Sequence, residues 1–418
     1  MRRREFLRGG ALALASWRAR ATPARAAAPH VLIAGGGFAG ACCALQLREL
    51  APAIRVTLID PQAHYVTCPM SNEVLAGLRT LASITTGRPG LPRAGVQCVL
   101  DQVTAIDAAR RRVRLGGGGA LAYDTLVVAP GIRFLFGQPE GYTEAATLHM
   151  PHAWQAGAQT KLLAKQLRAV ADGATVAISV PAGLMRCPPG PYERASLIAH
   201  WLSRHRKRCK VLVFDSNNHF PRQDVFSAAW EELYPGMIEW IAPSEGGAVT
   251  RVDVPTNTLY SSSGAHRVAL ANVIPPQAPG SLALVAGLAA GHGWCPIKPA
   301  SFESQLLEGI YVIGDACIAG AMPKAASAAR SHAQHCAAAI AASFAGRSPP
   351  VTEFDSVCYS LLAPESALAI HGRFALREGD IRPSEAAAAP AAEPTPGAEQ
   401  ASAAAQWYAQ IRAACFEG

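Results

Sequence analysis

The hydrophobic pattern of this 418-residue chain consists of short apolar runs separated by longer stretches with a helical pattern. The first run, residues 30–34, is followed by a glycine-rich turn, a helical pattern over residues 38–50 and a second run that ends at Asp60. Short, continuously apolar runs that alternate with helices are typical of parallel strands covered on both faces. The pattern therefore predicts an α/β fold that begins with a strand–helix–strand unit.

The turn after the first strand has the spacing G-x-G-x-x-G, at Gly35, Gly37 and Gly40. The missing side chains allow a tight turn, the close approach of a pyrophosphate and the packing of the helix on the strand. Asp60, at the end of the second strand, is suited to bind ribose hydroxyls. These residues predict a dinucleotide site at the N-terminus of the first helix.

A second strand–helix–strand unit is predicted over residues 174–181, 192–205 and 210–216. Its connecting turn, "AGLMRCPPGP", lacks the glycine spacing and carries prolines that remove backbone donors. We therefore expect no nicotinamide nucleotide to bind there. Either the reductant is small and reaches the cofactor directly, or this turn carries chemistry of its own.

Two further apolar strands end in turns, at residues 123–131 and 309–317. With the glycine turn they resemble the FAD motifs of the two-dinucleotide-binding flavoproteins, a class that includes disulfide reductases and sulfide:quinone reductases. The resemblance implies that FAD is the ligand of the first domain, near Ala129 and Gly131. It also implies that Asp315 holds the ribityl-phosphate part.

The expected architecture is α/β, with two Rossmann-like dinucleotide-binding domains of the disulfide-reductase type and a small C-terminal domain. Residues 28–150 and 265–345 form the FAD-binding domain, residues 151–264 the second Rossmann-like domain, and residues 346–418 the C-terminal domain. Residues 384–405 are rich in Ala, Pro and Glu and predict a linker. One short amphipathic helix is expected after it.

The net charge of +8 is concentrated at the N-terminus, because residues 1–26 hold seven Arg and one Glu and leave only +2 for the rest. This segment has a twin-arginine start, a short apolar run and a small-residue cleavage site, which predicts export to the periplasm. No apolar run is long enough to span a bilayer. No basic aromatic patch indicates nucleic-acid binding.

Eleven cysteines are present, without a C-x-x-C-H haem motif or a zinc-like spacing, so no metal site is expected and any haem belongs to a partner. An oxidising compartment is compatible with at least one disulfide. Cys187 precedes a helix whose N-terminus favours a thiolate, and Glu193 is a candidate proton acceptor. From the residues alone, Cys187 is either structural or redox-active. Cys42, Cys43, Cys295 and Cys317 are expected to pack, and no role is assigned to Cys98, Cys209, Cys336 and Cys415.

Longer motifs make the resemblance specific: "YVTCPMSNEV", "RCPPGPYERAS", "YVIGDACIAGAMPK" and "CYSLLAP". Residues 30–418 resemble the flavoprotein subunit of flavocytochrome c sulfide dehydrogenase and its SoxF-like relatives. The resemblance implies that Cys68 bonds the 8α carbon of the flavin and that Cys187 and Cys358 form a redox-active disulfide. It also implies that Asp315, Pro323 and Lys324 contact the FAD. Pro69, Met70 and the stretch "KAASAARSHA" depart from the family pattern.

The function that the resemblance implies is oxidation of hydrosulfide to sulfur or polysulfide, with FAD passing single electrons to a c-type cytochrome subunit. Hydrosulfide would attack the disulfide as in thiol–disulfide exchange. Two alternatives remain at this stage. One is a sulfide:quinone oxidoreductase, whose acceptor lies in the bilayer, and the other is a non-catalytic flavin subunit that docks a cytochrome.

Overall fold

The computed structural model describes residues 28–289, 293–350, 353–384 and 395–418. The predicted signal segment, residues 1–26, lies outside the described residues, as do residues 385–394 of the predicted linker.

The first domain is built on a parallel five-stranded sheet in the order β20-β9-β1-β2-β5. Its central strand β1 is fully buried because helices cover the sheet, and α1 packs closely on α8. The bounds are β1 His30–Ala34, α1 Phe38–Leu50, β2 Arg55–Asp60, β5 Gln97–Leu100, β9 Thr125–Val128, β20 Ile310–Val312 and α8 Ala326–Phe344. The predicted strand–helix–strand unit is confirmed.

The second domain has a parallel four-stranded sheet in the order β13-β12-β11-β17. Its elements are α4 Ala158–Ala169, β11 Thr175–Val180, α5 Gly190–His205, β12 Lys210–Asp215, α6 Gln223–Leu233, β13 Ile238–Ile241 and β17 Leu270–Val273. The strand β17 lies within the segment 265–345 that was assigned to the FAD-binding domain, yet it pairs with β11. The chain therefore returns to the first domain only after Val273.

Short helices and strands lie in the segments that connect these larger elements. They are β3 Tyr65–Val66, α2 Ser71–Ala76, η1 Ala82–Ile84, β4 Thr85–Thr86, α3 Gly90–Arg93, β6 Val103–Asp107, β7 Arg112–Leu115, β8 Ala120–Ala122, β10 Ile132–Phe134, η2 Ala145–Leu148, η3 Pro243–Glu245, β14 Arg251–Asp253, β15 Thr258–Ser261, β16 Gly264–Arg267, β18 Gln277–Pro279, α7 Ser281–Val285, β19 Cys295–Pro296, η4 Gly314–Ala316 and β21 Cys317–Ile318.

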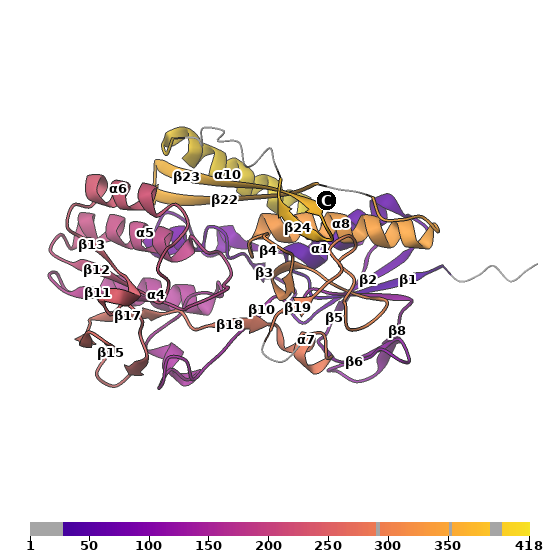
Figure 1. Cartoon of the computed structure of the whole chain (residues 1–418), viewed down its shortest axis with the longest axis horizontal. Coiled ribbons are helices and arrows are strands. Elements are labelled where there is room, and N and C mark those ends of the chain that lie inside the picture. The colour runs from indigo at the N-terminus through magenta and orange to yellow at the C-terminus, as the bar shows by residue number, and fades with distance from the viewer. Residues whose placement is uncertain (1–27, 290–292, 351–352, 385–394) are drawn as a thin grey trace, which may run out of the picture.

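The C-terminal domain is a long hairpin that crosses both sheet domains, followed by a helix (Figure 1). Its elements are β22 Glu353–Ala363, β23 Ser366–Arg377, β24 Asp380–Pro383, α10 Ala398–Arg412 and the π-helical turn η5 Ala413–Glu417. Phe354 and Phe374 join the core of the first domain, whereas Leu362 and Leu368 join the core of the second. The hairpin thereby ties the two domains together.

The linker prediction is wrong for residues 398–405, which form the first two turns of α10. Alanine has the highest helix propensity, and Ala404, Tyr408 and Ile411 are buried against the rest of the protein. The predicted helix therefore exists but starts earlier.

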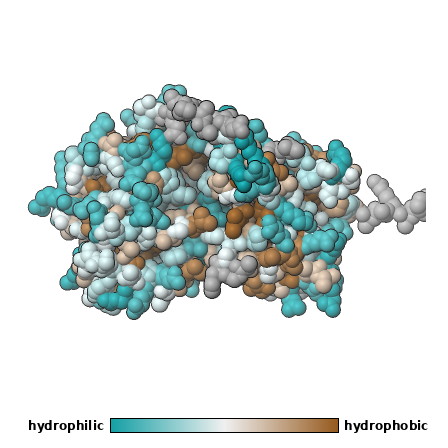
Figure 2. Space-filling model, in the orientation of Figure 1, coloured by the Kyte–Doolittle hydropathy of each residue, from teal (hydrophilic) through white to brown (hydrophobic). Residues whose placement is uncertain are grey.

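The α/β fold with two Rossmann-like domains and a small C-terminal domain is confirmed. Within the described residues, no helix is long and apolar enough to cross a membrane. In Figure 2 hydrophilic side chains dominate the rim of the face shown, and hydrophobic ones gather toward its middle.

Candidate functional site

A cavity of about 570 Å³ lies at the carboxyl ends of the first sheet's strands, the usual ligand position in such sheets. Both sheet domains, β22 and α10 contribute to its wall. Most of the residues predicted from the sequence line it: Gly35, Gly37, Asp60, Cys68, Ala129, Gly131, Cys187, Glu193, Asp315 and Cys358.

The glycine turn forms one end of this cavity. Gly35 has φ +107°, and a Cβ there would lie 2.2 Å from the Ala129 carbonyl oxygen. Gly40 does not line the cavity, and a Cβ on it would lie 1.8 Å from the Gly35 carbonyl oxygen. The first glycine therefore shapes the turn and the last one lets the helix approach the strand, as the spacing predicted.

Asp60 closes the turn from the side. Its Oδ2 accepts a hydrogen bond from the Gly36 N–H at 2.7 Å, and its Oδ1 lies 3.3 Å from Arg88 Nη2. Arg88 Nε donates to the Gly36 carbonyl oxygen at 2.6 Å. Arg88 Nη2 is buried and has no hydrogen-bond partner among the described residues. A glycine cradle with a buried guanidinium behind it fits the oxygen-rich part of a dinucleotide.

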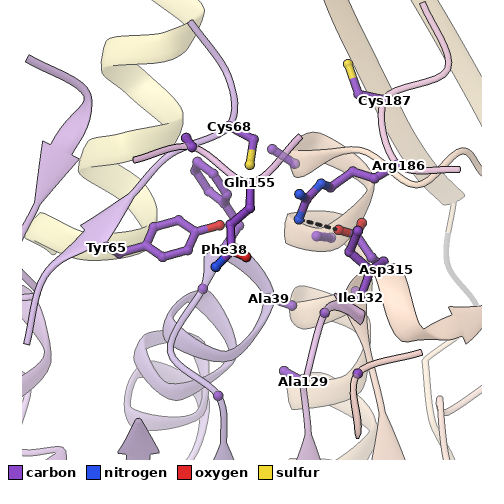
Figure 3. Close-up of a pocket in the computed structure, with 18 of the residues that line it drawn as sticks. Phe38, Ala39, Tyr65, Cys68, Ala129, Ile132, Gln155, Arg186, Cys187 and Asp315 are labelled. Carbon is purple, nitrogen blue, oxygen red and sulfur yellow. Dashed lines mark ion pairs between the residues drawn. The ribbon is translucent and has the colours of Figure 1, made fainter. Parts of the chain in front are cut away.

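Arg186 and Asp315 face each other across the middle of the cavity. Arg186 Nη1 lies 3.9 Å from Asp315 Oδ2, and Arg186 also donates to the Trp154 carbonyl oxygen. The indole N–H of Trp154 returns a hydrogen bond to the Arg186 carbonyl oxygen at 3.0 Å. Figure 3 shows the Arg186 side chain extended into the cavity, with Asp315 on one side of its guanidinium and the Cys68 sulfur on the other.

Cys68 sits in the tight connection between β3 and α2. The Ser71 N–H donates to the Cys68 carbonyl oxygen at 3.1 Å, and Met70 adopts a left-handed conformation with φ +66°. The neighbouring Thr67 shares a hydrogen bond of 2.8 Å with the Tyr408 hydroxyl of α10. These contacts fix the backbone, and the partly exposed Cys68 sulfur faces the cavity (Figure 3).

Cys187 and Cys358 reach the cavity from different elements, the turn before α5 and the middle of β22. The Cys187 N–H donates to the Lys324 carbonyl oxygen at 2.8 Å, which holds the residue in a left-handed conformation with φ +54°. The absence of a side chain at Gly190 leaves room for Cys187 and Trp154, because a Cβ there would lie 2.9 Å from Cys187 Sγ and 2.8 Å from the Trp154 ring. Both thiols are free in this structure, so their disulfide stays a prediction.

The predicted preference of Cys187 for the thiolate is wrong, because its surroundings raise the pKa of this thiol and do not lower it. Burial raises the pKa of Cys187 well above its ordinary value, and the charges of Cys358 and Glu193 raise it further. Burial and the charge of Glu193 likewise raise the pKa of Cys358 to about 12. The helix N-terminus is outweighed because the site is enclosed and already holds a carboxylate.

Glu193 lies in the first turn of α5, partly open to the cavity but surrounded by protein. Its Oε2 accepts from Asn72 Nδ2 at 2.7 Å, and its Oε1 accepts from the Leu361 N–H at 3.0 Å. Asn72 is oriented by Arg194, whose Nε donates to Asn72 Oδ1 at 2.9 Å. Burial outweighs both hydrogen bonds and raises the pKa of Glu193 to about 7. A carboxyl group with this pKa can exchange protons near neutral pH.

Pro323 and Lys324 do not line the main cavity but a second one of about 240 Å³. Lys324 Nζ donates to the carbonyl oxygens of Asp315 and Cys317 at 2.8 and 2.9 Å and lies 3.8 Å from the centre of the Trp294 ring. These partners hold the ammonium away from the main cavity. Ala325, which precedes α8, and the α8 residues Ala326 and Ala329 line the main cavity instead.

Several arginines of the site do not follow from the sequence motifs, among them Arg186 and Arg88. Arg186 immediately precedes Cys187 in the quoted "RCPPGP" motif, so a cation next to a candidate redox cysteine was the available signal. Arg88 lies in a loop with no motif, and only the fold brings it to Gly36. Cys295 and Cys317 are buried, as expected for packing residues.

Three family profiles match the chain. The central region of the sulfide dehydrogenase [flavocytochrome c] flavoprotein chain matches residues 160–275. The flavin-binding domain of flavocytochrome c sulphide dehydrogenase matches residues 350–416, and the pyridine nucleotide-disulphide oxidoreductase family matches residues 29–166.

The solved structure of the sulfide:quinone oxidoreductase from the hyperthermophilic bacterium Aquifex aeolicus is similar in fold, with a TM-score of 0.70 at 19% identity over 93% of this chain and 92% of that one. The covalent putidaredoxin reductase–putidaredoxin complex gives a TM-score of 0.62 at 20% identity, over 83% of this chain and 82% of that one. At these identities the likeness concerns the fold alone.

In sequence, the chain is 28% identical to the sulfide-quinone reductase of Aquifex aeolicus strain VF5 over 44% of this chain, which is less than half (42%) of that relative's length. It is 54% identical over 45 residues to the sulfide dehydrogenase [flavocytochrome c] flavoprotein chain of Chlorobaculum thiosulfatiphilum, 11% of this chain and 94% of that sequence. The chain therefore belongs to the flavoprotein-chain family of flavocytochrome c sulfide dehydrogenase, within the flavin oxidoreductases of the pyridine nucleotide-disulphide oxidoreductase type.

Proposed function

We propose that the protein is the FAD-dependent subunit of a sulfide dehydrogenase and oxidises hydrosulfide to sulfur or polysulfide. One observation carries the proposal: Cys187, Cys358 and Glu193 open into the same cavity as the glycine turn. Two sulfurs and a proton acceptor beside a dinucleotide cradle supply the groups that oxidation of a small sulfur nucleophile requires.

FAD fits the cavity at both ends. The turn at Gly35 and Gly37 would receive its pyrophosphate, Asp60 its ribose, and Asp315 its ribityl-phosphate part. Cys68 would hold the flavin through a thioether, because its sulfur faces the same cavity beside Arg186. When bound, FAD accepts electrons in pairs and releases them singly, which is needed when donor and acceptor differ in electron count.

The sulfur chemistry would use Cys187 and Cys358 as a disulfide. Burial and the charge of Glu193 disfavour thiolates at both positions, whereas a disulfide carries no charge. Hydrosulfide attacks one of the two sulfurs, so that a new S–S bond forms to the substrate and the Cys187–Cys358 bond breaks. The products of this step are one persulfide and one thiolate.

Glu193 would accept the proton that the substrate sulfur still carries. Its pKa of about 7 lets the carboxylate take up a proton near neutral pH and release it again. The hydrogen bonds from Asn72 and Leu361 keep both carboxylate oxygens in place during this exchange.

A c-type cytochrome subunit is the proposed electron acceptor, and any haem lies on that partner. The twin-arginine pattern of residues 1–26 supports a periplasmic location. The test measures sulfide-dependent reduction of a c-type cytochrome and of decylubiquinone by the purified protein. Preferential reduction of the cytochrome supports the proposal, whereas preferential reduction of the quinone indicates a sulfide:quinone oxidoreductase. A flavin that sulfide does not reduce at all would indicate a non-catalytic flavin subunit.

A further inference from the structure

The C-terminal segment, defined as residues 397–418, packs directly on the helix that follows the glycine turn. The ring centre of Phe416 lies 5.1 Å from that of Phe38 and 5.5 Å from that of Tyr65. Phe38, Tyr65 and Trp407 all line the main cavity. Figure 1 shows α10 running beside the hairpin over the junction of the two sheet domains. The position of this segment therefore affects the shape of the cavity.

Within this contact, the side chains of Cys415 and Cys42 are neighbours in the buried core. Cys42 belongs to α1 and is 4% exposed, and Cys415 belongs to η5 and is fully buried. Both are part of the first domain's hydrophobic core. The two cysteines thus lie in the same contact between α1 and η5, although 372 residues separate them along the chain.

A partly buried cation lies beside this pair of thiols. The guanidinium of Arg330, on α8, acts on both sulfurs, and its Nε has no hydrogen-bond partner among the described residues. The neighbouring Cys415 and, after it, the charge of Arg330 lower the pKa of Cys42 despite its burial. Cys42 is therefore the more easily deprotonated of the two thiols, and the thiolate is the nucleophile of disulfide exchange.

We propose that Cys42 and Cys415 form a second disulfide that fastens the C-terminal segment to α1, independently of the sulfur chemistry in the cavity. The oxidant is a small disulfide such as glutathione disulfide. The Cys42 thiolate attacks it and releases one glutathione, and Cys415 then displaces the second glutathione from Cys42. Two protein thiols are oxidised, one external disulfide is reduced, and the two thiol protons leave with the two glutathione molecules.

A second thiol pair in the same core provides the matched comparison. Cys43 and Cys336 are also neighbours in this core, and burial raises the pKa of Cys336 well above its ordinary value. This pair lies between α1 and α8, which pack against each other extensively, so an oxidant reaches it only if the helices separate. Cys415 lies in a five-residue turn, so a local opening of η5 is enough to expose it.

The test counts free thiols by intact mass spectrometry after incubation with glutathione disulfide, acid quenching and alkylation in denaturant. If the disulfide forms, Cys415→Ser frees Cys42 and has one more alkylated cysteine than the wild type. Cys336→Ser simply removes one thiol and has one fewer. The cavity cysteines are the same in all three proteins and cancel in the comparison, and the mass identifies any bound glutathione.

A Cys415→Ser protein with one alkylated cysteine fewer than the wild type overturns the proposal. If that variant does not fold, a tryptic map of the oxidised wild type decides, because residues 413–418 must then be linked to the peptide that contains Cys42. Fragmentation of the linked peptide distinguishes Cys42 from Cys43. Free residues 413–418, or a link to Cys43, also overturn the proposal.

Discussion

Replacing Glu193 by Gln removes a carboxyl group that titrates near neutral pH and keeps the shape of the side chain. Gln can still accept from the Leu361 N–H, but its amide faces the Asn72 Nδ2 donor, which Arg194 holds in place. This loss of one hydrogen bond does not depend on pH. The pH-dependent part of the effect therefore reports the ionisation of Glu193 alone.

The size of the expected change in the free energy of unfolding follows from the pKa of Glu193. Burial raises the pKa of Glu193 from 4.5 to about 7, so the folded protein binds this proton more tightly than the unfolded chain does. The associated stability is fully present below pH 4.5 and is lost as the pH rises to about 7. At about 1.4 kcal/mol for each tenfold change in proton affinity, the loss is about 3 kcal/mol. Glu193→Gln has no carboxyl group at this position and therefore keeps its stability as the pH rises.

The assay is urea denaturation of the wild type and of Glu193→Gln, followed by tryptophan fluorescence from about pH 4.5 to about pH 8. The difference in unfolding free energy between the two proteins should change by about 3 kcal/mol over this range, in favour of the variant at high pH. Glu232→Gln, an exposed change on α6, is the control and should follow the wild type. No substrate is added, so the ionisation of sulfide does not interfere. A difference that stays constant with pH would refute the role of Glu193 as a proton acceptor near neutrality.

Three further changes test separate parts of the site. Acid-precipitated wild-type protein should stay yellow and carry the mass of one FAD on the Cys68 peptide, whereas Cys68→Ser should give a colourless pellet; a yellow variant pellet contradicts the anchor. Gly35→Ala should lower the free energy of unfolding by about 1–3 kcal/mol, because residue 35 adopts a left-handed conformation, and urea denaturation measures this loss. The variant should also lose most of its bound FAD, because the new Cβ would lie 2.2 Å from the Ala129 carbonyl oxygen, and the flavin-to-protein absorbance ratio measures this loss. Gly190→Ala should lose about 1–3 kcal/mol through overpacking against Trp154 and Cys187, and an unchanged unfolding midpoint would argue against this contact.

The parts of the fold that were predictable are those set by local sequence. The apolar run of residues 30–34, the glycine spacing and Asp60 are contiguous, and each constrains the backbone within a few residues. From these residues the fold of the first domain and the glycine turn at one end of the cavity are predicted correctly. The first turns of α10 were missed because an alanine-rich composition suits both a linker and a helix. Distant contacts such as Tyr408 with Thr67 accompany the helix here.

The electrostatic details of the site depend on burial and on distant contacts, which the sequence does not display. The helix N-terminus beside Cys187 suggested a lowered thiol pKa, but enclosure and the neighbouring Glu193 raise it. Lys324 was expected at the cofactor, but carbonyl oxygens of the η4–β21 segment bind its ammonium. Arg88 reaches the site only through the fold, whereas Arg186 has a sequence signal in its place next to Cys187.

We propose that Cys187 and Cys358 transfer electrons from sulfide to a flavin bound in this cavity. Anaerobic titration of the FAD-loaded protein with sulfide, followed at the flavin absorbance, tests it most directly. We expect sulfide to bleach the wild-type flavin, and we expect Cys187→Ser and Cys358→Ser each to retain FAD without being bleached. Wild-type bleaching in either variant would contradict it.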